Sequence, residues 1–181
     1  MASTRLSAAV GVTRGYGQVE PNHLSAQRTG QIYAQLPAKA DIEVLENGQF
    51  VKYNYSAGVV DFEGAGEWML VFNEVKVYAP RETDADFAMV KGNYVAAVYN
   101  ALGDAMPVDT AMTPRVFKTN VGDIYTTNCV NVEISTLALG DILTPGADGF
   151  LTTGEGEMCF EVVKVYTLGD GQPAVKLMRI K

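Results

Sequence analysis

Histidine and cysteine are scarce in this chain, which has one histidine, His23, and two cysteines, Cys129 and Cys159. A hydrolase triad needs a base held in a fixed position, and His23 lies in a segment that we expect to be an extended arm. Zinc takes three or four nitrogen or sulfur ligands, more than these distant residues supply. No spacing suggests a disulfide framework, which favours a reducing compartment. We therefore expect no enzyme, no metal site and no cofactor.

Long apolar runs and clustered positive charge are also lacking. The sequence predicts neither a signal peptide nor a membrane-spanning segment. Lys and Arg number 14 against 21 Asp and Glu, a net charge of −7. Direct binding of nucleic acid or of a membrane is therefore not expected, because phosphate recognition needs gathered Lys and Arg side chains.

The excess of acid is uneven along the chain. Residues 1–40 hold four basic residues and one acidic residue, a net charge of +3, which leaves −10 for residues 41–181 out of the total of −7. The apolar residues of the first 38 positions are scattered singly, a spacing that supports neither a helix nor a long strand. We expect residues 1–40 to form an extended arm that lies on an acidic surface, and residues 41–181 to form a β-rich body.

What the chain does have is typical of an all-β protein. It contains 18 glycines, 9% aromatic residues and many Val and Thr, and short apolar segments alternate with glycine turns. These features predict a sandwich or barrel of short antiparallel strands with an extended N-terminal arm.

One strand motif occurs twice. Phe-x-x-Val-Lys-Val-Tyr spans residues 72–78 and 160–166, each time after a Gly-x-Gly-Glu step. Alternation along a strand places the Phe, Lys and Tyr of each copy on one face and the valines on the other. We expect the valine face to be core and the Phe/Lys/Tyr face to be half-covered. Two ordinary strands and a true internal duplication both remain open.

Other segments carry local signals. Residues 41–46 and 49–53 flank Asn47-Gly48 and are predicted to form a hairpin with a two-residue turn. Residues 87–102 are ambiguous between a helix and short strands, and a strand over residues 93–100 is favoured. Residues 103–120 are expected to be a long loop. Polar residues 80–86 are expected to be a solvated loop rather than a cation site around Asp84 and Asp86.

In the last third of the chain, Gly122-Asp123-Ile124 and Gly140-Asp141-Ile142 each predict a turn followed by a short strand. Residues 129–134 alternate as a strand does, residues 144–149 indicate another turn, and residues 160–180 indicate a final hairpin. A pair of glycosidase carboxylates from any two strands remains open. Trp68, at the head of a strand, is expected in the core rather than in a sugar groove.

Several short segments of the sequence resemble segments of one family of proteins. They are Leu45–Lys52, Val71–Tyr78, Val121–Asn128 and Leu139–Thr144 with Asp148-Gly149. Together they are similar to accessory head proteins of tailed bacteriophages, which are capsid decoration, cement or head-fibre-base proteins.

The resemblance covers roughly residues 40–155 and implies a virion structural protein on the capsid exterior, made in the host cytoplasm. It would stabilise the shell by bridging capsomers. Its partners would be the major capsid protein and copies of itself, in a homo-oligomer. A tail-tube or neck protein is the alternative, and a carboxylate-dependent carbohydrate-active enzyme is a more distant one.

The residues expected at the contacts come from the arm and from the two motif copies. They are Arg5, Arg14, Tyr16, Arg28, Tyr33, Phe72, Lys76, Tyr78, Phe160, Lys164 and Tyr166.

Overall fold

The structure is a computed structural model that describes residues 19–23, 36–72, 88–90, 95–99, 105–109, 112–168 and 171–181. These residues form β-strands, connecting turns and one short 3₁₀ helix, η2 (Ile134–Thr136), and they contain no α-helix. The all-β prediction is confirmed. No helix among the described segments has the length and apolarity needed to cross a membrane.

The larger sheet has six antiparallel strands and is built mainly from the last third of the chain. In spatial order they are β1 (Val19–His23), β10 (Ile124–Thr127), β14 (Pro173–Arg179), β13 (Phe160–Thr167), β11 (Ile142–Pro145) and β12 (Leu151–Thr153). The expected final hairpin is confirmed as the β13–β14 pair at the centre of this sheet.

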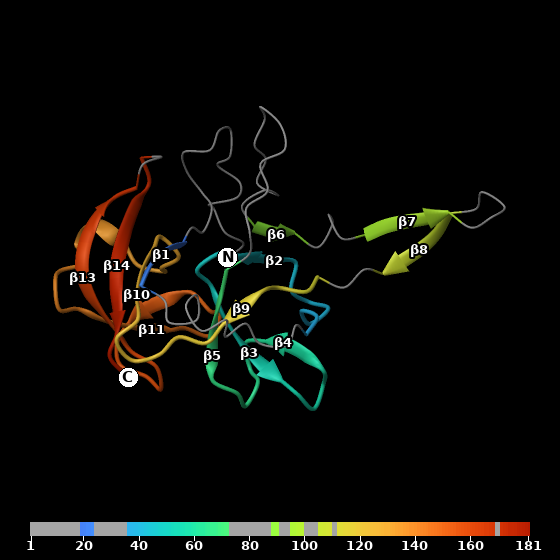
Figure 1. Cartoon of the computed structure of the whole chain (residues 1–181), viewed down its shortest axis with the longest axis horizontal. Helices are drawn as coiled ribbons and strands as arrows, with labels where there is room; N and C mark the ends of the chain where they lie inside the picture. The colour runs from blue at the N-terminus through green and yellow to red at the C-terminus, as the bar shows by residue number, and fades with distance from the viewer. Residues whose placement is uncertain are drawn as a thin grey trace.

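The second sheet has four antiparallel strands from the middle of the chain. In spatial order they are β4 (Val59–Asp61), β3 (Phe50–Asn54), β5 (Trp68–Val71) and β9 (Val116–Phe117). Two further pairs are β2 (Val44–Glu46) with β6 (Ala88–Val90), and β7 (Val95–Tyr99) with β8 (Ala105–Asp109). Figure 1 shows the six-stranded sheet on one side of the body and the four-stranded sheet beside it.

A hydrophobic core joins the two larger sheets. Phe50 of the four-stranded sheet lies against Tyr125 and Phe160 of the six-stranded sheet, with ring centroids 6.5 Å and 5.4 Å away, and all three side chains are fully buried. The six-stranded sheet is open at β1 and β12. Of the two expected architectures, the structure is therefore a sandwich and not a closed barrel.

The other face of the four-stranded sheet is covered as well. A second cluster contains Val51, Met69 and Val71 together with Leu45 and Met112 from the segments that cross this face. All four residues of β5 are consequently buried, which explains its unbroken apolar sequence. Trp68 is a core residue, as expected.

The two Gly-Asp-Ile segments form the same local structure. Gly122 and Gly140 have positive φ angles of 91° and 88°. In each turn the aspartate side chain accepts a hydrogen bond of 2.8 Å from the backbone N–H three residues earlier. Each following strand then pairs with one strand of the β13–β14 hairpin. The predicted turns and strands are confirmed, and they flank the hairpin on its two sides.

The hairpin predicted around Asn47-Gly48 is wrong, although its turn exists. β2 pairs with β6 and β3 pairs with β4 and β5, so the two strands belong to different sheets. The turn backbone is bonded elsewhere: Gly48 donates to the carbonyl of Val71, and Phe50 donates to that of Gly149. The turn therefore leads the chain from one sheet into another.

Three further local predictions are settled by the strands. Within residues 87–102 the structure describes residues 88–90 and 95–99, which form β6 and β7, so the favoured strand is confirmed for the described part of residues 93–100. The loop predicted for residues 103–120 is wrong, because it contains β8 and β9, and β9 is buried against β5. The strand predicted for residues 129–134 is also wrong, because these residues make one isolated bridge and then enter η2.

Part of the predicted arm lies on the sandwich. β1 adds an edge strand to the six-stranded sheet, where Val19 packs against the core between the sheets. Leu36 and Ala38 pack on the second cluster, and Ala38 forms a bridge with Val60. Residues 1–18 and 24–35, which hold the rest of the arm, lie outside the described residues, as does the loop at residues 80–86.

Candidate protein interaction surface

A β-bulge in β13 decides which residues of the second motif copy reach the surface. Val162 pairs with Leu177 and Lys164 pairs with Lys176, so Val163 is an extra residue in β13. The extra residue reverses the alternation of the two faces. Phe160 and Val162 point to the core before the bulge, and Val165 packs on the core after it. Lys164 is exposed on the opposite face.

This bulge corrects one predicted contact residue. Phe160 was expected on a half-covered face with Lys164 and Tyr166, but it is fully buried in the core between the sheets. Simple alternation fails because residues on the two sides of a bulge change faces. Lys164 and Tyr166 do share the outer face, as expected.

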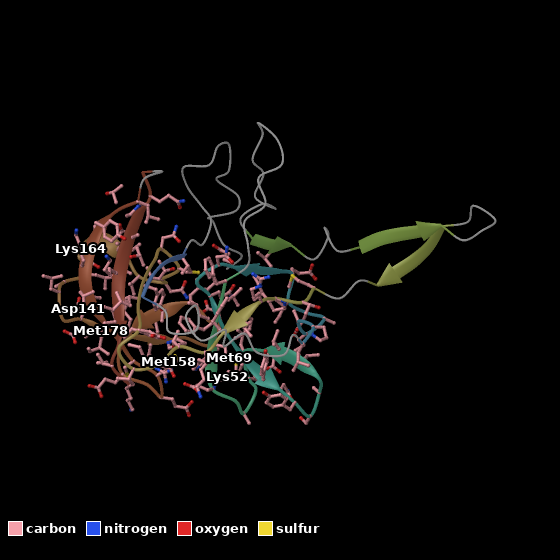
Figure 2. All side chains as sticks on the ribbon, viewed as in Figure 1. Lys52, Met69, Asp141, Met158, Lys164 and Met178 are labelled. Carbon is pink, nitrogen blue, oxygen red and sulfur yellow. The ribbon has the colours of Figure 1, made fainter. Side chains whose placement is uncertain are left out.

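Lys164, Tyr166 and Lys176 form a compact group on the outer face of the six-stranded sheet, which we call the Lys–Tyr–Lys patch. The ammonium groups of Lys164 and Lys176 lie 5.3 Å and 5.7 Å from the centroid of the Tyr166 ring. Figure 2 shows Lys164 on the side of this sheet away from Lys52 and Met69 of the four-stranded sheet.

The tyrosine of the patch is held in place. Its hydroxyl lies 2.7 Å from Oγ1 of Thr126, a fully buried residue of β10. The Tyr166 ring therefore reaches from β13 across β14 to β10, beside Lys176, which is paired with both Lys164 and Thr126. A ring fixed in this way loses little conformational entropy when a partner binds.

The charges of the patch are not neutralised within the described residues, where neither Lys164 nor Lys176 makes an ion pair. Two like charges directly opposite each other on neighbouring strands are unfavourable by several tenths of a kcal/mol. Cation–π attraction to the Tyr166 ring offsets part of this repulsion. A partner carboxylate would remove the remainder, so the arrangement favours an acidic surface.

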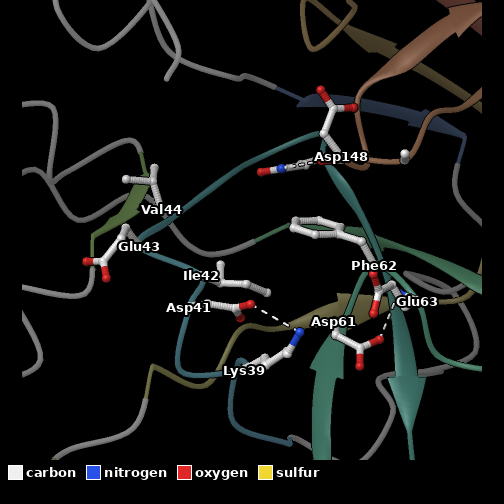
Figure 3. Close-up of a pocket in the computed structure, with 11 residues that line it drawn as sticks. Lys39, Asp41, Ile42, Glu43, Val44, Asp61, Phe62, Glu63 and Asp148 are labelled. Carbon is white, nitrogen blue, oxygen red and sulfur yellow. Dashed lines mark hydrogen bonds and ion pairs between the residues drawn. The ribbon is translucent and has the colours of Figure 1, made fainter. Parts of the chain in front are cut away.

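A second feature is an acidic cleft with a volume of about 320 Å³ beside the four-stranded sheet. Phe62 and Ile42 contribute apolar walls (Figure 3). Its charged lining residues are Lys39, Asp41, Glu43, Asp61, Glu63 and Asp148.

Asp61, one of the carboxylates that line this cleft, forms hydrogen bonds within its own turn. Asp61 accepts hydrogen bonds from the Asn54 side chain and from the backbone N–H groups of Glu63 and Gly64. Burial alone would raise the pKa of Asp61, but these hydrogen bonds and the charge of Lys39 leave it below its ordinary value. A glycosidase acid needs the opposite shift.

The other carboxylates also point to a structural role. Asp41 forms an ion pair of 3.1 Å with Lys39, and this hydrogen bond raises the pKa of Lys39. Asp148 accepts hydrogen bonds from the Asn131 side chain and from the N–H of Phe150. Figure 3 shows Glu43 and Asp148 pointing away from each other. In the part of the chain that the structure describes, no three acidic, His or Cys side chains gather to hold a metal ion.

Comparisons with known protein families, curated proteins and solved structures find no match for this chain. The resemblance to phage accessory head proteins therefore depends on the short phrases between residues 40 and 155.

The remaining predicted contact residues fall into two groups. Phe72 is half-buried beside Phe117, with ring centroids 5.8 Å apart, so it packs within the chain. Arg5, Arg14, Tyr16, Arg28, Tyr33, Lys76 and Tyr78 lie outside the described residues. Sequence reasoning missed Lys176. The predicted final hairpin contained the signal, because folding residues 160–180 about the 169–172 turn places Lys176 beside Lys164.

Proposed function

We propose that this chain is a structural protein of a tailed phage that binds the outside of the capsid and stabilises it by bridging capsomers. The observation that carries the proposal is the Lys–Tyr–Lys patch, an ordered basic and aromatic surface on a protein of net charge −7. In this role the chain binds other proteins and has no catalytic step.

The chemistry of the patch fits a protein partner. Tyrosine offers a large rigid contact surface at low entropic cost, and flanking lysines give charge complementarity to carboxylates. We propose that the patch contacts an acidic area of the major capsid protein. The acidic body favours the capsid exterior, because packaged DNA inside the shell would repel it.

The proposal is tested by adding the purified chain to assembled shells that lack it and measuring co-sedimentation. We expect saturable binding that weakens with added salt. The double variant Lys164→Glu with Lys176→Glu should bind at least about tenfold more weakly, because two favourable charge contacts become repulsive.

The control is Lys181→Glu, which is compared with the single patch variant Lys164→Glu, because both residues are exposed lysines and Lys181 lies outside the patch. Lys181→Glu should bind as the wild type does, and Lys164→Glu should bind more weakly. Equal loss in these two variants, or no loss in the patch variants, would refute the role of the patch. The copy number per particle separates the shell from the tail: hundreds of copies would support the proposal, and six or twelve would assign the chain to a tail or neck.

A further inference from the structure

A strip of apolar side chains lies next to the Lys–Tyr–Lys patch on the outer face of the six-stranded sheet. Ile124 of β10 is directly opposite Met178 of β14. Their neighbours Tyr125 and Leu177 are fully buried in the core, so alternation places Ile124 and Met178 on the outer face, where both side chains are half-buried. Figure 2 shows Met178 on the same side of this sheet as Lys164.

Val121 extends this strip beyond the start of β10. It lies in the turn before that strand and is 68% exposed. A hydrogen bond of 2.8 Å from the N–H of Gly122 to the carbonyl of Arg179 holds the turn against the end of β14. The carboxylate of this turn, Asp123, is buried and so adds no exposed charge beside Val121.

Ile180 extends the strip at the end of β14. It follows Met178 by two positions and is 39% exposed. The next residue, Lys181, is directed elsewhere, because its ammonium group donates a hydrogen bond of 2.9 Å to the carbonyl of Gly156. Neighbouring apolar side chains that stay in contact with water mark an interaction site. The apolar strip consists of Val121, Ile124, Met178 and Ile180.

Charged residues border the strip on two sides. Glu161 of β13 lies opposite Met178 and ends the apolar surface in that direction. On β14, Lys176 precedes Met178 by two positions, so the two residues lie on the same face about 7 Å apart along the strand. A protein that covers this corner of the sheet therefore meets a positive charge and an apolar surface side by side.

We propose that the Lys–Tyr–Lys patch and the apolar strip form one binding site for an extended segment of the major capsid protein. This segment carries a carboxylate and a large apolar side chain two positions apart. Such side chains share one face of an extended segment and lie about 7 Å apart, which matches the spacing of Lys176 and Met178. The inference rests on the proposed function for the identity of the partner and adds the chemistry by which the partner is recognised.

Each half of the site disfavours a simpler partner. A purely apolar segment would cover Lys164 and Lys176 without a counter-charge, which is unfavourable because the ammonium groups lose their hydration. A purely acidic segment would leave the apolar strip in contact with water. A segment that combines a carboxylate with an apolar side chain satisfies both halves.

A second copy of the chain is a poorer occupant. Its turn before β11 offers a similar pair, because Leu139 is 72% exposed and Asp141 follows two positions later. The Asp141 carboxylate, however, already accepts a hydrogen bond of 2.8 Å from the N–H of Ala138. Two chains of net charge −7 also repel each other. We therefore assign the site to another protein.

Val121→Ser tests the apolar strip in the co-sedimentation assay with assembled shells. Because Val121 is exposed in a turn, its replacement should leave the melting temperature of the chain unchanged and weaken binding about fivefold. The loss should be the same at low and high salt, since salt does not screen an apolar contact. Lys164→Glu, by contrast, should lose most of its effect at high salt.

Leu139→Ser is the matched control. Leu139 and Val121 occupy the same position in the two Gly-Asp-Ile turns, each just before a glycine of positive φ, but the turn of Leu139 is bonded to Val162 of β13. Leu139→Ser should bind shells as the wild type does. Equal losses in the two variants, or no loss in Val121→Ser, would overturn the proposal.

Photo-crosslinking identifies the occupant. With benzoylphenylalanine in place of Val121, irradiation of the complex with shells should crosslink the chain to the major capsid protein, at a position with an Asp or Glu two residues away. Replacing that acid by lysine should weaken binding of the wild-type chain and restore binding of Lys164→Glu, because the charges are exchanged. A crosslink to a second copy of the chain, or a lysine replacement without rescue, would refute the assignment of the partner.

The outcomes separate this inference from the proposed function. A wild-type chain that does not bind shells would refute the proposed function and this inference with it. Binding that requires Lys164 and Lys176 but not Val121 would support the proposed function and reject the apolar strip alone.

Discussion

Glu67 links three parts of the chain through one carboxylate. Its Oε1 lies 2.7 Å from Nη2 of Arg179 at the end of β14, and its Oε2 lies 2.8 Å from Nζ of Lys118 after β9. Arg179 also donates to the carbonyl and the hydroxyl of Thr119. Burial alone would raise the pKa of Glu67, but the hydrogen bonds and charges of Lys118 and Arg179 hold it below the ordinary value of 4.5.

Replacing this carboxylate should make stability less dependent on pH. A group with a depressed folded pKa stabilises the protein above its unfolded pKa, and the stabilisation is lost as the pH falls from 4.5 through the lower folded value. We expect Glu67→Gln to lower the free energy of unfolding by about 1–2 kcal/mol at pH 7. Urea unfolding at pH 7 and pH 3 should show this difference shrinking at the lower pH.

The other motif copy offers the control. Glu157 also follows a Gly-x-Gly step, but its side chain is 84% exposed and lies 3.6 Å from Lys52. Glu157→Gln should change stability by less than about 0.5 kcal/mol. A difference for Glu67→Gln that is equal at both pH values would show that the ion pairs are not its source.

Gly149 is required where the two layers meet. It has a φ of 77°, and a Cβ added there would lie 2.0 Å from the carbonyl oxygen of Phe50. Gly149→Ala should therefore cost about 2–4 kcal/mol in thermal or urea unfolding. Gly140→Ala is the control, because Gly140 has a similar φ of 88° with no atom near its Cβ position. It should cost only the backbone strain, about 1 kcal/mol; equal costs would exclude the close approach as the cause.

At the level of elements, the bulge in β13 explains how a basic surface and a core can share one strand. Val163 lies outside the ladder, so its removal joins Val162 to Lys164 without changing the face of either residue. We expect deletion of Val163 to cost about 1 kcal/mol or less and to leave the Lys–Tyr–Lys patch on the surface.

Deletion of Val165 is the matched comparison, because this residue lies in the regular part of the strand. Its loss would turn Tyr166 towards the core, which should cost more than about 3 kcal/mol or prevent folding. Urea unfolding measures both costs, and accessibility of the Tyr166 ring to a surface quencher reports its face. If the two deletions lowered the free energy of unfolding by similar amounts, the bulge at Val163 would not be what determines which residues of β13 face the core.

The contribution of the N-terminal segment appears only at the level of the whole molecule. Val19 of β1 packs on the core between the sheets, whereas Leu36 and Ala38 pack on the second cluster. We expect deletion of residues 1–35 to lower the stability of the body by about 1–2 kcal/mol, roughly the value of one partly buried valine and its strand pairing. Deletion of residues 1–18 spares β1 and should leave the melting temperature nearly unchanged.

The same two deletions test whether the arm bridges capsomers. Both remove Arg5, Arg14 and Tyr16, so both should reduce the protection of shells against heat while the Lys–Tyr–Lys patch still binds. Heat release of the shell contents measures this protection. Full protection by the chain without residues 1–18 would remove that part of the arm from the mechanism.

Sequence patterns predicted the structural features that depend on residues close together in the chain. The glycine turns, the β13–β14 hairpin and the all-β class follow from backbone preferences and strand alternation, which act over a few positions. The outward positions of Lys164 and Tyr166 were also predicted. If the residue pairs of the predicted final hairpin had been assigned, Lys176 would have been placed opposite Lys164 and recognised as part of the surface.

The amino-acid sequence by itself therefore determined that this protein is a β-rich, acidic chain with turns at known places. Tertiary structure alone decided that β2 and β3 enter different sheets, because the turn between them forms its hydrogen bonds with Val71 and Gly149. It also decided that Phe160 is core and Lys164 is surface, since a bulge depends on the register of the partner strand. Contacts between residues far apart in the chain leave no periodic signal, so only the folded chain shows them.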